Sequence, residues 1–250
     1  MLTAKFRIQA EALPLIEGYD RLSRLVEALD NVIPVGAWHR LPRTEDEGSS
    51  GWIPLSSRDD YLRRVARDLG EDAERWPGTG EGFSTVVTTA RNVATWDSEE
   101  RAVLKYSPRQ GVITLEWLLE EESASAEFER TRQAFLAICN EVEVLFACSD
   151  RPASPRPSGK PGRTYFGIDY RVFPHREFLG WMGFVPKDID SHEIPEADEL
   201  IPVLAKRGTM VVAVGDRFAV HNHAHIEKAQ RVEMRLVDLD ALPVTDPRFL

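Results

Sequence analysis

Three histidines separated by single residues form the one grouping in this sequence whose spacing suggests metal chemistry. His221, His223 and His225 give the pattern H-x-H-x-H, and on a β-strand all three imidazoles would share a face and suit zinc or copper. The surrounding residues instead indicate a junction between a strand and a helix, where the rings would splay apart. No carboxylate or cysteine accompanies them at ligand spacing. We therefore expect no bound metal, and interpret them as polar residues around a helix start capped by Asn222.

Other residue types that could carry out catalysis lack the patterns that catalysis requires. The sequence contains no G-x-S-x-G, no S-x-x-K and no cysteine beside a suitable histidine. The GTGEG segment at 78–82 is similar to a phosphate-binding loop, but no Lys-Ser/Thr pair follows it and it leads into an expected strand. The carboxylates Glu120, Glu121 and Glu122 indicate a solvated run. We expect a protein that is not an enzyme, has no catalytic residues and needs no cofactor.

A strongly acidic segment beside aromatic residues indicates a binding surface instead. The acidic segment, residues 187–199, contains six carboxylates and one lysine. Such a loop would attract a basic surface and speed association, and aromatic side chains often anchor interfaces. The alternatives are a solvated connection for the segment and core burial for the aromatic residues. The residues predicted to contact a partner are Asp188, Asp190, Glu193, Glu196, Asp198, Glu199, Trp181 and Phe184.

Composition narrows the class of protein further. The chain has 31 Lys and Arg against 41 Asp and Glu, a net charge of -10, which argues against binding to nucleic acid because phosphate contacts need an excess of cations. There is no run of 18 or more apolar residues to span a bilayer, and Lys5, Arg7 and Glu11 interrupt any signal-peptide core. We expect a cytoplasmic protein with neither nucleic-acid nor membrane partners. Its oligomeric state cannot be read from the sequence.

Helices and strands are expected in mixed runs without a regular alternation, which predicts an α+β fold with a largely antiparallel sheet, packed helices and a single domain over residues 1–250. Apolar residues at helical spacing predict helices at 20–29, 58–69, 126–146 and 224–236. Strands are expected at 5–9, 83–90, 102–106, 112–118, 165–173, 179–185 and 209–214. The proline-rich basic segment 151–163 predicts a flexible exposed loop.

Two further residue types bear on the expected core. Cys139 and Cys148 both lie on one apolar stretch that we expect to be helical, about 13 Å apart along the helix axis, too far for a disulfide. We interpret them as buried thiols. Four tryptophans lie in or beside expected loops, where they either cap the core or contact a ligand. They are Trp38, Trp52, Trp76 and Trp96.

The C-terminal third resembles the bacterial Immunity protein 52 family over about residues 166–243. The matching stretches are FLGWMGFVP from Phe178, GTMVVAV from Gly208, and N-x-x-H-I-x-K-A-x-R-V-E-x-R-L-V-D-L-x-x-L-P from Asn222. The resemblance implies an α+β fold and a cytoplasmic immunity protein encoded beside a polymorphic toxin, often a type VI secretion effector. The toxins of such proteins resemble restriction-endonuclease-fold nucleases, and the resemblance implies neutralisation by binding.

The matched positions are interpreted mainly as builders of the fold. They are Gly180, Trp181, Gly183, Phe184, Pro186, Asn222, His225, Ile226, Ala229, Arg231, Glu233 and Arg235. An acidic inhibitor of a nuclease could occupy or screen the positive groove that binds nucleic acid. Two other classes stay open: a metal-dependent hydrolase that uses His221, His223 and His225, and a structural subunit or adaptor without a toxin partner.

Overall fold

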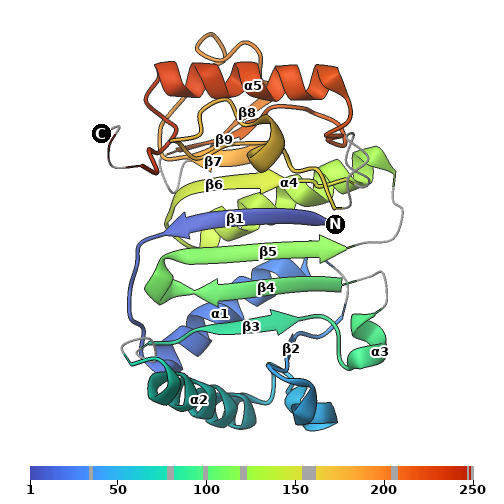
Figure 1. Ribbon diagram of the computed structural model, residues 1–250, viewed down its shortest axis with the longest axis vertical. Helices are drawn as coiled ribbons and strands as arrows, with labels where there is room; N and C mark the ends of the chain where they lie inside the picture. Colours follow the sequence, from blue (N-terminus) through green and yellow to red (C-terminus); the bar gives the residue numbers. More distant parts are fainter. Residues whose placement is uncertain are drawn as a thin grey trace. The chain divides into compact units, whose positions relative to one another are not determined.

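The computed structural model describes residues 1–33, 36–77, 82–97, 101–118, 123–153, 162–203, 208–246 and 248. The chain divides into two compact units, which we call the N-terminal unit (Arg7–Glu121) and the C-terminal unit (Met1–Phe6 with Glu122–Leu250). Each unit combines helices with antiparallel strands (Figure 1). The predicted α+β class with a largely antiparallel sheet is therefore confirmed, and the single domain over residues 1–250 stays a prediction.

Four strands of the N-terminal unit pair antiparallel in the order β2-β3-β4-β5. They are β2 (His39–Arg40), β3 (Thr85–Thr88), β4 (Arg101–Ser107) and β5 (Val112–Leu118). The 3-10 turn η2 (Pro108–Gln110) joins β4 to β5, and Gly111 follows with a φ of 65°. Alternate residues of β5 are buried, as expected for a strand with one face on the core.

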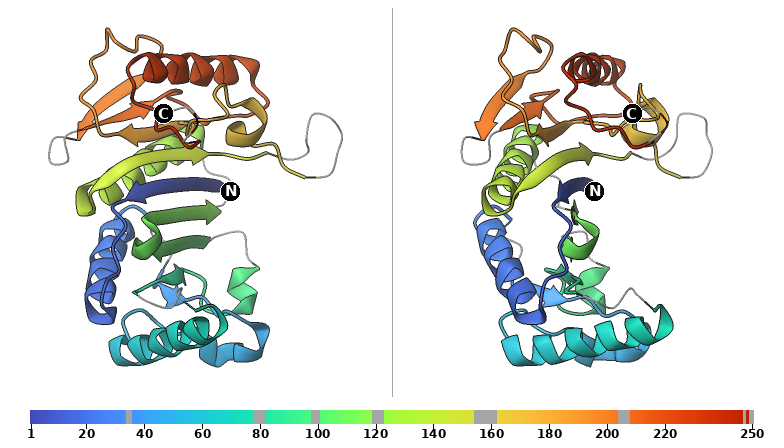
Figure 2. Two further views of the ribbon diagram at one scale, coloured as in Figure 1. Left: turned by 60° about the vertical axis from the view of Figure 1, so that its left-hand side comes forward. Right: turned by 90° about the vertical axis from the view of Figure 1, so that its left-hand side faces the viewer.

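Two long helices and two short ones complete the described part of this unit. They are α1 (Leu15–Asp30), η1 (Glu45–Gly51), α2 (Arg58–Arg75) and α3 (Val93–Trp96). Helix α1 lies along one face of strands β3–β5 (Figure 2), and Tyr19 from α1 packs on Tyr61 from α2 with ring centroids 5.7 Å apart. The helices expected at 20–29 and 58–69 overlap α1 and α2, although α1 begins earlier and α2 ends later than expected. The helices η1 and α3 were not predicted, because they are too short to show a helical period.

The described strands of the C-terminal unit lie in the order β1-β6-β7-β9-β8. They are β1 (Leu2–Ile8), β6 (Val144–Asp150), β7 (Met182–Val185), β8 (Glu199–Val203) and β9 (Gly208–Val212). Helices α4 (Ala124–Glu141) and α5 (His223–Asp238) lie on opposite sides of these strands (Figure 2). The predicted cap of α5 is confirmed, because the side chain of Asn222 accepts a hydrogen bond from the N–H of Ala224.

Glycines in the FLGWMGFVP motif allow β6 and the chain around β7 to approach closely. A Cβ atom on Gly180, whose φ is 72°, would lie 2.0 Å from the carbonyl oxygen of Ser149. One on Gly183 would lie 2.1 Å from the carbonyl oxygen of Ala147. Any larger residue at either position would separate the backbones, so these two glycines build the fold.

One predicted helix in this unit is too long, and one predicted strand is wrong. The helix expected at 126–146 ends at Glu141, where Val142 turns to an extended conformation, and β6 follows. Cys139 and Cys148 therefore lie on different elements, although both are buried free thiols as predicted. The strand expected at 165–173 is instead a π-helix, η3 (Phe166–Tyr170), whose first two N–H groups donate to the buried carboxylate of Asp150. That long-range acceptor favours the helical turn over an extended strand.

Several loop predictions fall outside the described residues: 78–81 of the GTGEG segment, the run 120–122, and 154–161 of the basic loop. Among the helices that the structure does describe, none is both long and apolar enough to cross a bilayer.

Candidate binding surfaces

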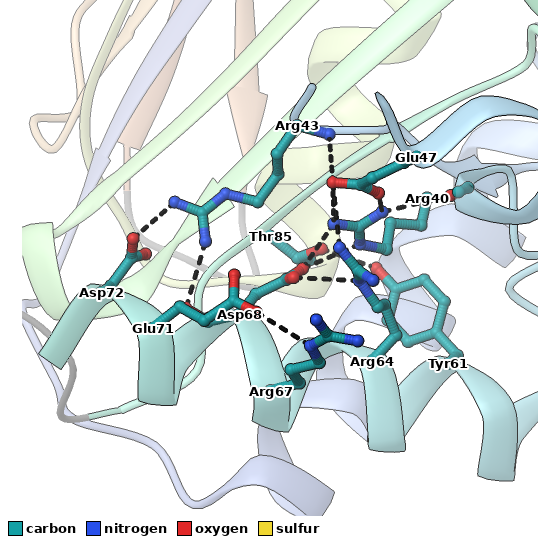
Figure 3. Close-up of polar contacts among 11 residues, drawn as sticks. Arg40, Arg43, Glu47, Tyr61, Arg64, Arg67, Asp68, Glu71, Asp72 and Thr85 are labelled. Atoms are coloured by element: carbon teal, nitrogen blue, oxygen red, sulfur yellow. Dashed lines mark hydrogen bonds and ion pairs between the residues drawn. The ribbon is translucent and has the colours of Figure 1, made fainter. Parts of the chain in front are cut away.

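Arg40 lies at the centre of a buried network of charges in the N-terminal unit (Figure 3). Only 2% of the residue is exposed, and its guanidinium lies 2.6 Å from carboxylate oxygens of both Glu47 and Asp68. Arg64 from α2 reaches the same two carboxylates, at 2.9 Å and 3.0 Å. Two arginines and two carboxylates thus close a ring that joins β2, η1 and α2.

The contacts within the ring favour the charged forms of Arg40 and Glu47. Burial alone would lower the pKa of Arg40, but hydrogen bonds from Arg40 to Glu47 and Asp68 raise it above its ordinary value. Burial would likewise raise the pKa of Glu47, but its hydrogen bonds with Arg40 and with the backbone N–H of Arg43 hold it below the ordinary range. Arg40 also donates to the carbonyl oxygen of Gly51 at 3.1 Å. The segment that contains η1 is therefore held at two points, Glu47 and Gly51.

The segment held by these contacts continues to Trp52, which borders two open depressions. One, of about 480 Å³, is also lined by Pro54 and by Arg63, Arg64 and Arg67 of α2. The other, of about 510 Å³, lies between the segment and α3. We call the second depression the Trp52–Trp96 cleft. Its lining residues are Leu41, Pro42, Arg43, Thr44, Gly48, Trp52, Val93, Trp96 and Asp97.

The α3 side of the Trp52–Trp96 cleft is fixed by local contacts. Asn92 and Thr95 form a reciprocal capping box at the start of α3. The guanidinium of Arg101 lies 4.6 Å from the ring centroid of Trp96 and donates to the carbonyl oxygen of the same residue at 2.6 Å. The two tryptophan rings are 6.4 Å apart at 54°. Both walls of the cleft are therefore held in place without a partner.

The acidic segment of the C-terminal unit contains carboxylates that are already paired within the protein. Glu196 forms an ion pair with Arg235 at 3.0 Å, and Asp198 forms one with Lys228. The carboxylate of Glu199 lies 3.8 Å from Arg132 on α4. These three residues, predicted to contact a partner, thus also tie the segment and β8 to the neighbouring helices.

Asp188 and Asp190 differ from the rest of the segment. Both residues are exposed, and neither carboxylate has an ion pair within the described part of the chain. Glu193 is partly buried and accepts a hydrogen bond from the backbone N–H of Asp190 at 2.8 Å, which shapes the turn. Of the six predicted carboxylates, Asp188 and Asp190 are therefore the most available to a partner.

The structure places the two predicted aromatic anchors in the core. Trp181 and Phe184 are both fully buried. The indole N–H of Trp181 donates to the carbonyl oxygen of Val214 at 2.9 Å, and its ring packs on Phe128. Phe184 lies on β7, between β6 and β9, and Trp181 directly precedes this strand, so neither side chain is on a surface that a partner can reach. The core alternative describes them, and this corrects their assignment as contact residues.

The three histidines lie at the start of α5 and do not converge. His221 and His223 are exposed, while the Nδ1 atom of His225 accepts a hydrogen bond from the N–H of Ala219 at 3.2 Å. Residues two apart on a helix point about 200° apart, which separates the last two rings. Within the described residues, no three His, Cys, Asp or Glu side chains gather as a metal site.

Glu233 is a buried carboxylate that the sequence reasoning did not single out as a charged core residue. It is 0% exposed on α5, and its Oε1 atom accepts hydrogen bonds from the N–H groups of Leu179 at 2.8 Å and Gly180 at 3.5 Å. Burial raises its pKa to about 7, and these backbone donors only partly oppose that shift. Its contact joins α5 to the glycine motif, so two stretches of the family-like pattern meet here.

The sequence analysis did not predict the network around Arg40, although the spacing of two of its members indicates an ion pair. Arg64 and Asp68 are four residues apart on a predicted helix, a spacing that favours an ion pair. Nothing local marks Arg40 as their partner, since it lies 28 residues from Asp68. Trp52 was noted as a loop tryptophan, but its role as the border between two depressions depends on tertiary structure.

Comparison with solved structures gives a similarity in fold. No family model matches this chain, and no curated protein matches it. Among solved structures, its fold is similar to that of the Pseudomonas aeruginosa T6SS (type VI secretion system) protein PA0821, with a TM-score of 0.53 and 12% identity. The match covers 94% of this chain and 72% of that one. At this identity the likeness shows a shared fold.

Proposed function

We propose that this protein is an immunity protein of a type VI secretion system, which binds a cognate toxin and neutralises it by direct contact. The observation that carries the proposal is the fold similarity to a T6SS protein over 94% of the chain. The resemblance of residues 166–243 to the Immunity protein 52 family supports the same class. We take the toxin to be a nuclease with a restriction-endonuclease-like fold, as that resemblance implies.

The charge of the protein supports a nuclease as partner. A nuclease needs a cationic groove to bind phosphates, and the -10 net charge of this chain is complementary to such a groove. The N-terminal unit has 14 Lys and Arg against 21 Asp and Glu, and the C-terminal unit 17 against 20. The N-terminal unit thus holds -7 of the total, so the acidic segment is not the main source of the negative field.

Co-expression with the toxin tests this proposal. The probe is the C-terminal nuclease domain of the large toxin gene expected beside this one, expressed from an inducible promoter in a sensitive host. We expect the wild-type protein to restore growth and to co-purify with the domain in equal amounts. The control is an unrelated immunity protein of similar net charge, which should not protect. Absence of both rescue and co-purification would show that the proposal is wrong.

A further inference from the structure

We infer that the Trp52–Trp96 cleft is a docking site for a segment of the toxin that presents an apolar side chain next to a lysine or arginine. The inference rests on the proposed function and names the surface that carries it. It also replaces Trp181 and Phe184, which are buried, by Trp52 and Trp96 as the expected aromatic contacts.

Apolar side chains line the cleft at the surface of the N-terminal unit. Val93 is 63% exposed, and Trp52 and Trp96 are partly exposed beside it. Leu41 and Pro42 line the cleft as well. Aromatic residues in a pocket with apolar neighbours are the composition typical of binding hot spots. This arrangement suits one large apolar side chain of a partner.

The walls of the cleft are fixed before any partner binds. The ring formed by Arg40, Glu47, Arg64 and Asp68 holds the segment that carries Trp52. Burying such charges costs desolvation free energy, so a network of this kind adds little net stability relative to an apolar core. It does fix the loop through the contacts of Arg40 with Glu47 and with the carbonyl oxygen of Gly51. A preformed cleft loses less entropy on binding.

The charges at the cleft favour a cationic neighbour for that apolar side chain. Arg43 is paired with Asp72. Asp97 is exposed and has no ion pair to any residue that the structure describes, so it is the lining charge left to attract a partner. The surrounding unit carries a net charge of -7, by the counts above. A nuclease domain displays lysine and arginine where it binds phosphates, which supplies the matching chemistry.

Two cleft variants and one control test the docking site. Trp52→Ala removes an aromatic wall, and Val93→Arg places a bulky cation in the cleft from an exposed position where folding should be unaffected. We expect each to weaken binding of the purified, catalytically inactivated toxin domain by at least about tenfold, as for a hot-spot residue. Trp76→Ala is the matched control, because Trp76 is 62% exposed in the same unit but does not line the cleft. It should bind as the wild type does.

A third variant tests the charge. Asp97→Asn should weaken binding a few-fold and reduce its dependence on salt. Wild-type affinity for all three cleft variants would overturn the docking site while the proposed function stands. If the wild-type protein does not bind the toxin domain, the proposed function itself is wrong. If Trp52→Ala and Val93→Arg turn a dimer into a monomer in light scattering without weakening toxin binding, a second copy of this chain occupies the cleft and the inference is wrong.

Discussion

Arg40 in the N-terminal unit and Glu233 in the C-terminal unit are both buried charges, but their surroundings differ. Arg40 contacts two carboxylates, and a second arginine completes the ring. Glu233 accepts hydrogen bonds from backbone N–H groups, and its Oε2 atom has no hydrogen-bond partner in the described part of the chain. Opposite charges therefore surround Arg40, whereas the hydrogen bonds to Glu233 come from backbone N–H groups.

Because of this difference, Glu47 and Glu233 should contribute to stability with opposite dependence on pH. The pKa of Glu47 lies below its ordinary value of 4.5, so its contribution to stability is present above that value and is lost as the pH falls through the folded-state pKa. The pKa of Glu233 is raised to about 7, so its contribution is complete below 4.5 and is lost as the pH rises through about 7. A change of pH should therefore change the stability contributions of Glu47 and Glu233 in opposite directions.

Replacing Arg40 should have the largest effect on stability. Arg40→Ala leaves Glu47 and Asp68 as buried carboxylates with only Arg64 to compensate them, and we expect the free energy of unfolding to fall by about 3–5 kcal/mol. Urea denaturation at neutral pH measures the change. The matched control is Arg63→Ala, since that side chain is 76% exposed and its pair with Asp60 lies on the surface. Equal losses for the two variants would show that the ring is not a buried network.

Replacing Glu233 should change the pH dependence of stability more than any other substitution in the C-terminal unit. The shift from 4.5 to about 7 corresponds to a loss of about 3 kcal/mol as the wild type is taken from pH 5 to pH 8. Glu233→Gln keeps an acceptor for the same N–H groups but cannot ionise, so the stability of the variant should fall less than that of the wild type in this range. Equal slopes for wild type and variant would mean that Glu233 does not titrate there.

The smallest effects should come from the acidic segment, and they distinguish its two kinds of carboxylate. Replacing Asp188 and Asp190 together by Asn should slow association with the toxin domain a few-fold at low salt and flatten its salt dependence. Replacing Glu196 by Gln and Asp198 by Asn should change association less, because Arg235 and Lys228 already compensate these charges. Stopped-flow measurements over a range of salt concentrations compare the pairs. Identical association rates for both double variants and the wild type would show that the segment only connects two strands.

The sequence predicted elements whose signals are local and missed those set by tertiary contacts. The apolar periodicity of α1, α2 and α5 is strong, and the expected helices overlap the observed ones. The apolar run of β6 directly follows α4 and extends its pattern, so helix and strand could not be separated there. The carboxylate of Asp150 accepts a hydrogen bond from the first N–H group of η3, 16 residues away. A local sequence pattern cannot indicate such a contact. The burial of Trp181 depends in the same way on strands that lie far from it in the sequence.

Titration of the toxin's nuclease domain into the purified full-length protein, followed by calorimetry and by nuclease activity in the same samples, is the most direct test of the central claim. We predict one toxin domain bound per chain, with a Kd in the nanomolar range or tighter, and loss of nuclease activity in proportion to the complex formed. No heat of binding, or a complex that retains full nuclease activity, would contradict the claim that this protein neutralises a toxin by binding it.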